Sequence, residues 1–103
     1  MAITITKENF KSVVLQSKEP VLVDFWAAWC RPCQMLGPIV ESLSTEVEGL
    51  AVVGKVNVDE QPELANEFRI MSIPTMLVFK NGKVANQAIG VRSKEEIRKL
   101  LGV

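Results

Sequence analysis

The chain has 103 residues, of which 48% are hydrophobic, and its 12 basic residues balance its 12 acidic ones, so the formal net charge is zero. We expect one small domain spanning residues 1–103, and the hydrophobic content argues against disorder. The balanced charge, with no block of one sign, argues against an electrostatic grip on nucleic acid or on an anionic membrane.

The use of cysteine and the N-terminal sequence bear on location. Two cysteines are too few for the disulfide framework of a small secreted protein. The first residues lack the basic and apolar regions of an export signal, and no window has the roughly 20 apolar residues that a membrane helix requires. We therefore expect a soluble, cytoplasmic protein, acting as a monomer and without contact to a membrane.

The first part of the chain predicts two strands separated by a helix. Residues 3–6 alternate isoleucine with threonine, as in a short strand. Thr6 could cap a following helix that ends before Pro20. Its inward positions would be Phe10, Val13 and Val14. Residues 21–27 are apolar on both alternating faces, apart from Asp24, which predicts a central strand covered on both sides.

Both cysteines follow this strand, in the segment Trp29-Cys30-Arg31-Pro32-Cys33. A helical pattern then runs to Glu48-Gly49, and we expect Pro38 to kink it. The apolar positions of this pattern are Cys33, Leu36, Val40, Leu43 and Val47.

The second half of the chain predicts a strand at 51–57, a short helix beginning at 59–62, and two strands at 75–80 and 83–89. The short helix would carry Leu64, Ala65 and Phe68. Asn81-Gly82 between the last two strands is typical of a tight hairpin. The segment from Ser93 to Glu96 is a capping box for a final helix with Ile97, Leu100 and Leu101 on one face.

The predicted order of elements is βαβαβαββα. Strands that alternate with helices indicate an α/β fold with a parallel sheet, and the closing hairpin adds an antiparallel part. We therefore predict a central mixed sheet of five strands flanked by four helices.

Cys30 and Cys33 allow three interpretations. Half of a zinc site is disfavoured because the chain has no second Cys-x-x-Cys pair and no histidine. Inert core thiols are disfavoured because Arg31 and Pro32 fit poorly in a core. A pair two residues apart at the start of a helix favours redox chemistry, because the helix N-terminus stabilises the thiolate of the first cysteine.

From end to end the chain resembles the thioredoxins. The resemblance is carried by Val23–Ala27, Trp29–Cys33, Pro38, Lys55–Asp59, Ile73-Pro74-Thr75, Phe79–Gly82 and Gly90. It implies the thioredoxin fold and a protein-disulfide reductase whose redox-active group is a Cys30–Cys33 disulfide, with no metal and no bound cofactor. It also implies two kinds of partner: disulfide-containing target proteins and thioredoxin reductase, through which NADPH acts indirectly.

Position within the segment predicts the role of each sulfur. Cys30 lies just outside the helix and should be the exposed attacking thiolate, whereas Cys33, one turn in, should be the buried resolving thiol. Pro32 fixes one backbone angle and helps to hold the pair at bonding distance.

Asp24 is the next candidate catalytic residue. A carboxylate in an apolar central strand is costly to ionise, so its pKa should be raised. The resemblance implies that Asp24 lies beneath Cys33 and takes its proton through water, and that Lys55 pairs with this carboxylate. The alternatives are an aspartate that reaches solvent at a strand end and a lysine that only extends its stem along the strand.

Pro74 is the remaining residue whose interpretation changes with the resemblance. An X-Pro bond is cis in only about 5% of cases, but the resemblance implies a cis bond facing the dithiol, with the backbone of Ile73 pairing with an extended target segment. The predicted target-binding residues are Trp29, Ile73, Pro74, Thr75, Gly90 and Val91. Core packing is the alternative for Trp29, although Trp26 is the better core candidate. Packing is also the expectation for Met35, Met71 and Met76.

Arg31 departs from the family pattern, which has glycine between the first cysteine and the proline. A permanent cation beside Cys30 should stabilise its thiolate and make the protein a weaker reductant, although solvent would reduce the effect. Gln34 stands where the family often has lysine, so positive charge has partly moved. Arg31 could instead select acidic partners.

Two other functions remain open from the sequence alone. One is a disulfide oxidase or isomerase in an oxidising compartment, against which the missing export signal speaks. The other is a partner subunit of thioredoxin fold that does not need its cysteines.

Overall fold

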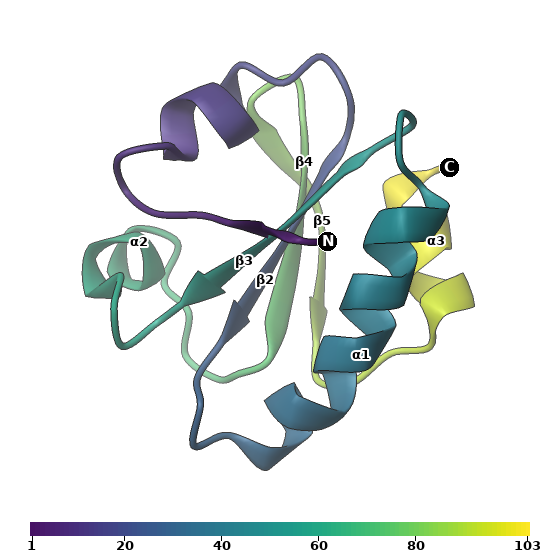
Figure 1. Ribbon diagram of the computed structural model, residues 1–103. Coiled ribbons are helices and arrows are strands. Elements are labelled where there is room, and N and C mark those ends of the chain that lie inside the picture. The colour runs from purple at the N-terminus through teal and green to yellow at the C-terminus, as the bar shows by residue number, and fades with distance from the viewer.

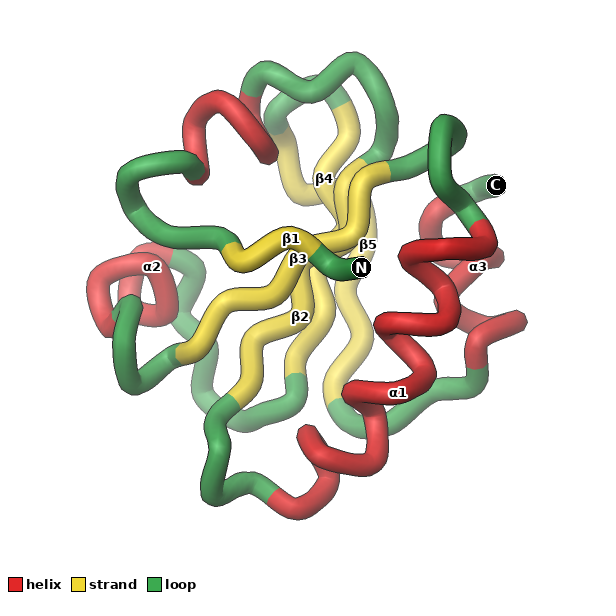
Figure 2. The backbone as a smooth tube through the Cα atoms, in the orientation of Figure 1, coloured by secondary structure: helices red, strands yellow, loops and turns green.

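The computed structural model describes all residues, 1–103, and its centre is a five-stranded mixed sheet (Figures 1 and 2). The strands lie in the order β1-β3-β2-β4-β5. β1 and β2 run parallel to β3, while β4 runs antiparallel to both β2 and β5. The strands are β1 (Ile3–Thr4), β2 (Val21–Trp26), β3 (Val52–Asn57), β4 (Thr75–Lys80) and β5 (Lys83–Ile89). The predicted mixed sheet is confirmed.

Four helices cover the two faces of this sheet, which confirms the predicted order βαβαβαββα. They are η1 (Lys11–Leu15), α1 (Arg31–Glu46), α2 (Pro62–Glu67) and α3 (Lys94–Leu101). Figures 1 and 2 show α1 and α3 on one side of the sheet, and α2 and the short helix that follows β1 on the other. The sheet is therefore the middle of three layers.

β2 is buried on both faces, as its apolar sequence predicts. Val21, Val23 and Phe25 belong to the apolar cluster on the η1 and α2 side. Leu22 belongs to the second cluster, which contains the buried stripe of α1. Because side chains alternate along a strand, Asp24 points to the face that α1 and α3 cover.

The predicted stripe runs along α1 and ends at Val47 just beyond it, and each of the five positions of the stripe is buried. The helix continues through Pro38. Figure 1 shows its first turns running at an angle to the later ones, which fits the expected kink.

The start of the first helix differs from the prediction. Thr6 is not a cap: its backbone N–H donates to Asn9 Oδ1 at 2.8 Å, and Asn9 Nδ2 donates to the carbonyl of Thr4 at 2.9 Å. A turn held by the Asn9 amide therefore precedes the helix, which begins only at Lys11. The inward positions are confirmed, with Phe10 and Val14 buried and Val13 half-buried.

The hairpin turn and the capping box predicted in the second half of the chain are both confirmed. Asn81 and Gly82 both have positive φ, 53° and 78°, as a two-residue hairpin turn requires. Ser93 Oγ accepts from the backbone of Glu96, whose carboxylate accepts in return from the backbone of Ser93, so the capping box is complete.

Candidate active site

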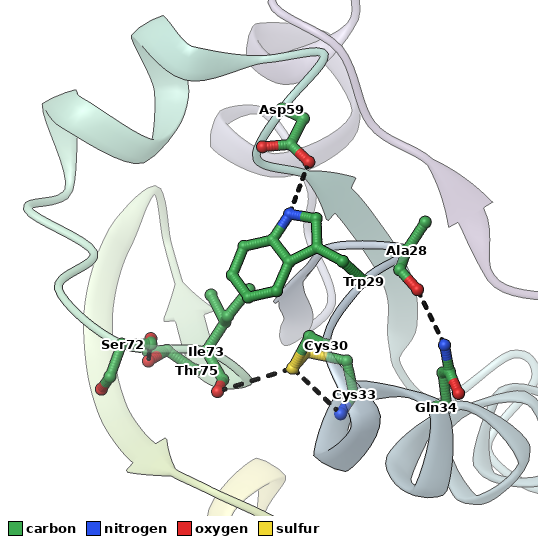
Figure 3. Close-up of a disulfide and its surroundings, with 9 residues drawn as sticks. All are labelled: Ala28, Trp29, Cys30, Cys33, Gln34, Asp59, Ser72, Ile73 and Thr75. Carbon is green, nitrogen blue, oxygen red and sulfur yellow. Dashed lines mark hydrogen bonds between the residues drawn. A yellow bond between two sulfur atoms is a disulfide. The ribbon is translucent and has the colours of Figure 1, made fainter.

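The two cysteines lie where β2 passes into α1, at one end of the molecule. β2 ends at Trp26, and α1 begins at Arg31. Cys30 is the residue that precedes the first helical turn, and Cys33 lies within that turn. The two form a disulfide, with their Cα atoms 5.3 Å apart (Figure 3).

The start of α1 favours negative charge on Cys30. The backbone of Cys30 is extended, and its sulfur accepts a hydrogen bond from the backbone N–H of Cys33 at 3.3 Å (Figure 3). Pro32 occupies the first turn, where its missing N–H leaves no intrahelical bond unmade. The partial positive charge of the helix N-terminus adds to the same effect. A thiolate at Cys30 is therefore stabilised by a direct donor and by the helix dipole.

The expected contrast in exposure between the two sulfurs is wrong for this disulfide form. Cys30 is 5% exposed and Cys33 is 4% exposed. The sulfur of Cys30 lies 3.8 Å from the carbonyl oxygen of Ile73, which comes from the segment before β4. The resemblance implies that the Ile73-Pro74 bond faces the dithiol, and this segment covers Cys30 even though Cys30 precedes the helix.

Trp29 lies beside the disulfide and is 71% exposed, so core packing is excluded for it. Its indole Nε1 donates to Asp59 Oδ2 at 2.9 Å, which fixes the ring over the site (Figure 3). Trp26, the expected core tryptophan, is half-buried beside the two cysteines. Asp59 was not among the predicted site residues. It lies at the end of the Lys55–Asp59 motif, but its bond to Trp29 joins residues 30 positions apart and has no local signal in the sequence.

The bond between Ile73 and Pro74 is cis, as the resemblance implies. Gly90, with φ of 91°, donates its N–H to the carbonyl of Pro74 at 2.8 Å. Thr75 is buried, and its hydroxyl donates to the carbonyl of Ser72 at 2.6 Å. Its side chain is therefore engaged within the protein.

The predicted target-binding residues are only partly brought together. Trp29 and Ile73 line one hollow of about 190 Å³ beside the disulfide. Its other lining residues are Val58, Ala65, Ile70, Met71 and Ser72. Pro74, Thr75, Gly90 and Val91 do not line it.

Two methionines differ from the expectation of packing. Met71 is 94% exposed and Met35 is 63% exposed, whereas Met76 is fully buried. Met71 follows α2 in a connecting segment, and Met35 lies on the outer face of α1, opposite the buried stripe. Hydrophobic type alone did not distinguish these three positions.

Asp24 is completely buried, so the alternative of an aspartate that reaches solvent is excluded. Neither of its carboxylate oxygens has a hydrogen-bond partner. Burial raises the pKa of Asp24 from 3.8 to about 7, and the positive charge of Lys55 partly opposes that rise. The predicted raised pKa is confirmed, and the group can exchange a proton near neutral pH.

Lys55 lies opposite Asp24 in the pairing of β2 with β3. Its ammonium forms an ion pair with Glu41 Oε2 at 3.9 Å and lies 4.8 Å from the centroid of the Trp26 ring. Lys55 therefore acts on Asp24 electrostatically, while its ammonium also interacts with Glu41 and with the ring of Trp26.

Arg31 is exposed and takes part in none of the ion pairs of the structure. Gln34, one residue after Cys33, folds back, and its Nε2 donates to the carbonyl of Ala28 at 2.7 Å (Figure 3). The side chain of Gln34 therefore braces the loop that carries Trp29, and Arg31 is left as the free cation next to Cys30.

The structure holds no cluster of metal-binding side chains and no helix able to span a membrane. Nowhere do three or more histidine, cysteine, aspartate or glutamate side chains gather in a way that could hold a metal ion. None of the helices has the length and apolar character needed to cross a bilayer.

Comparison with known proteins gives one family. The family model described as Thioredoxin matches residues 1–102. A thioredoxin from Chlorobaculum thiosulfatiphilum is 51% identical over 94 residues, covering 91% of this chain and 87% of that protein. Thioredoxin 2 from Chlorobaculum tepidum is 51% identical over 96 residues, with 93% and 88% covered. A thioredoxin from Rickettsia felis is 47% identical over 97 residues, with 94% and 92% covered.

Proposed function

The chain belongs to the thioredoxin family and is a protein-disulfide reductase with a redox-active Cys30–Cys33 pair, and from this premise we propose how its residues divide the work. Cys30 is the nucleophile, Cys33 the resolving thiol and Asp24 the buried proton acceptor. The single observation that carries this assignment is the hydrogen bond from the backbone of Cys33 to the sulfur of Cys30, at the N-terminus of α1.

In the first step, the thiolate of Cys30 attacks one sulfur of a target disulfide. A bond forms between Cys30 and that sulfur, the target disulfide breaks, and the other target sulfur leaves as a thiolate. The helix N-terminus supports this step because it stabilises the thiolate of reduced Cys30.

In the second step, Cys33 loses its proton and attacks the sulfur of Cys30. The Cys30–Cys33 disulfide forms, the mixed disulfide breaks, and the second target sulfur leaves, so that the target has gained two electrons. Asp24 is the proposed acceptor of the proton. Its pKa of about 7 and its position on the sheet face beneath α1 support that role, and Lys55 adjusts its proton affinity.

Binding of the target is proposed to use the surface around the disulfide. Exposed Trp29 and half-buried Ile73 offer apolar contact, and the backbone of Ile73 pairs with an extended target segment. Pro74, Thr75, Gly90 and Val91 are the proposed continuation of this surface. The hydrogen bond from the N–H of Gly90 to the carbonyl of Pro74 supports this arrangement by joining two of these residues.

We further propose that thioredoxin reductase restores the dithiol with electrons from NADPH, and that the protein works in the cytoplasm. That compartment holds protein thiols reduced, which suits a protein that donates electrons to disulfides.

The test is reduction of insulin disulfides by NADPH and a thioredoxin reductase. We expect turnover with the native chain and none with Cys30→Ser or Cys33→Ser. Cys33→Ser should in addition accumulate a mixed disulfide with insulin, because Cys30 can attack but nothing resolves the product. Unfolding curves of both variants serve as the control for folding. Turnover by Cys30→Ser would exclude Cys30 as the nucleophile.

A further inference from the structure

Glu41 of α1 stands between Lys55 and the N-terminal segment. Its Oε1 accepts a hydrogen bond from the backbone N–H of Ala2 at 2.9 Å. Its Oε2 lies 3.9 Å from Lys55 Nζ. The two oxygens of one carboxylate therefore join the N-terminal segment to the lysine that faces Asp24.

Lys55 is the one cation whose charge lowers the pKa of Asp24. Its ammonium nevertheless lies against Glu41 and over the ring of Trp26. Asp24 takes part in no ion pair, and both of its oxygens lack a partner. The cation that could neutralise Asp24 is thus held by a different carboxylate.

Solvent explains why Lys55 stays with Glu41. The two side chains border a cavity of about 300 Å³ that also reaches Thr4, Asn57 and Gln61. The side chain of Glu41 is 40% exposed and that of Lys55 is 23% exposed, whereas Asp24 is fully buried. Burial therefore makes a negative charge costly at Asp24, and the lysine pairs with the partly exposed Glu41.

We propose that Glu41 is a positioning residue that holds the ammonium of Lys55 away from Asp24 and so keeps Asp24 protonated to higher pH. The inference deepens the proposed role of Asp24, and it rests on that role only for the effect on reaction rate. Glu41 favours the protonated form of Asp24 in two ways. It draws the ammonium of Lys55 away from Asp24, and its own negative charge disfavours a second negative charge on Asp24.

The other charged groups around this face do not replace Glu41. On the neighbouring strand β4, the residue opposite Asp24 is Met76, which is apolar. On α3, Lys94 and Arg98 both pair with Glu46, the last residue of α1. The first turn of α1 and its cap contribute the two cysteines, which are joined as a disulfide in this form, and Arg31, whose side chain is exposed to solvent.

The experiment measures the protonation midpoint of Asp24 by carboxyl carbon NMR in the oxidised protein. Glu41→Gln keeps the shape of the side chain and an oxygen for the N–H of Ala2, and it removes the charge. We expect the midpoint of Asp24 to fall by about half a pH unit or more, because Lys55 is released toward it. Lys55→Met should move the midpoint in the opposite direction.

Two variants serve as controls. Glu48→Gln removes an exposed carboxylate just beyond α1 that forms no ion pair, and it should leave the midpoint unchanged. Glu41→Asp retains the charge and should lie closer to the native protein than Glu41→Gln does. An unchanged or raised midpoint in Glu41→Gln would overturn the inference.

The pH profile of insulin reduction separates this inference from the proposed function. If the midpoint and the rate profile both shift to lower pH in Glu41→Gln, the inference and the role of Asp24 are both supported. If the midpoint shifts and the rate profile does not, Glu41 still positions Lys55, and Asp24 is not the proton acceptor.

Discussion

At the scale of single residues, the site combines groups whose surroundings differ sharply. Cys30 meets a backbone donor at a helix start, Asp24 is buried with no hydrogen-bond partner, and Arg31 stands in solvent. Each environment favours a different protonation or charge state. The proposed reaction depends on a stabilised thiolate at Cys30, a buried carboxyl at Asp24 and a solvated cation at Arg31 all lying in or beside one site.

Arg31 provides a prediction about the redox balance. Arg31→Gly removes a cation adjacent to Cys30, so the thiolate and the reduced dithiol become less stable, and the reduction potential should fall. Because Arg31 is exposed, we expect a change of only about 10–20 mV, corresponding to less than about 1 kcal/mol. Equilibration of both proteins with glutathione buffers measures it.

Arg31→Gln is the matched control for this prediction, because it removes the charge without adding the backbone freedom of glycine. Equal potentials for Arg31→Gln and Arg31→Gly would assign the effect to charge. If neither differs from the native protein, Arg31 does not tune the pair, and its effect on the choice of acidic targets becomes the question to test.

At the scale of elements, the short edge strand β1 depends on a close approach to β3. Ile3 pairs with Gly54, and a Cβ atom at Gly54 would overlap Cδ1 of Ile5 and lie 3.2 Å from the carbonyl oxygen of Ile3. Gly54→Ala should therefore displace β1 and lower the free energy of unfolding by about 1–3 kcal/mol. Urea unfolding monitored by circular dichroism measures this loss.

Gly37→Ala is the matched control, because a Cβ atom at Gly37 meets nothing within 4 Å. In that helix position alanine gains helix propensity, and the following Pro38 opposes part of the gain, so the net change should be within about 0.5 kcal/mol. Equal losses in the two variants would mean that close packing of β1 on β3 is not what glycine provides at position 54.

The elements were also the level at which the sequence was most informative. Periodicity and turn residues such as Asn81-Gly82 and Ser93 predicted every strand and helix, because these signals are local. The cap at Thr6 was wrong because the helix begins only at Lys11, after a turn in which the side chain of Asn9 bonds the backbone of Thr6 and Thr4.

The site was only partly predictable. The cysteine pair and Asp24 stand out in the sequence, since both depart from their immediate neighbours. The burial of Cys30, the hydrogen bond of Asp59 and the ion pair of Glu41 depend on residues far along the chain. Met71 is exposed although its residue type favours burial. These features follow from tertiary contacts and leave no local pattern.

At the scale of the whole molecule, one buried carboxyl links pH to stability. The pKa of Asp24 is about 7 in the folded protein and 3.8 in the free side chain. Between these values the folded state binds more protons than the unfolded state, so stability falls as pH rises from about 4 to about 7. This span corresponds to a loss of at most about 4 kcal/mol, complete above pH 7.

Asp24→Asn should remove this dependence. We expect the free energy of unfolding to become nearly constant between pH 4 and pH 7, and to exceed that of the native protein by about 2–4 kcal/mol at pH 8. Urea unfolding across this range measures both effects. Asp59→Asn, which removes a surface carboxylate, should keep the native slope. A native slope in Asp24→Asn would show that another group is responsible.

The hairpin turn at Asn81-Gly82 has a consequence for how the protein ages. An asparagine side chain followed by glycine is open to attack by the next backbone nitrogen, because glycine presents no Cβ to block ring closure, and hydrolysis of the ring leaves aspartate or its β-linked isomer. Figure 1 shows this turn at the end of the sheet opposite the start of α1. Stored samples should therefore become heterogeneous in charge at a place remote from the sulfurs. The loss of chromatographic purity and the loss of reducing capacity should then proceed at different rates.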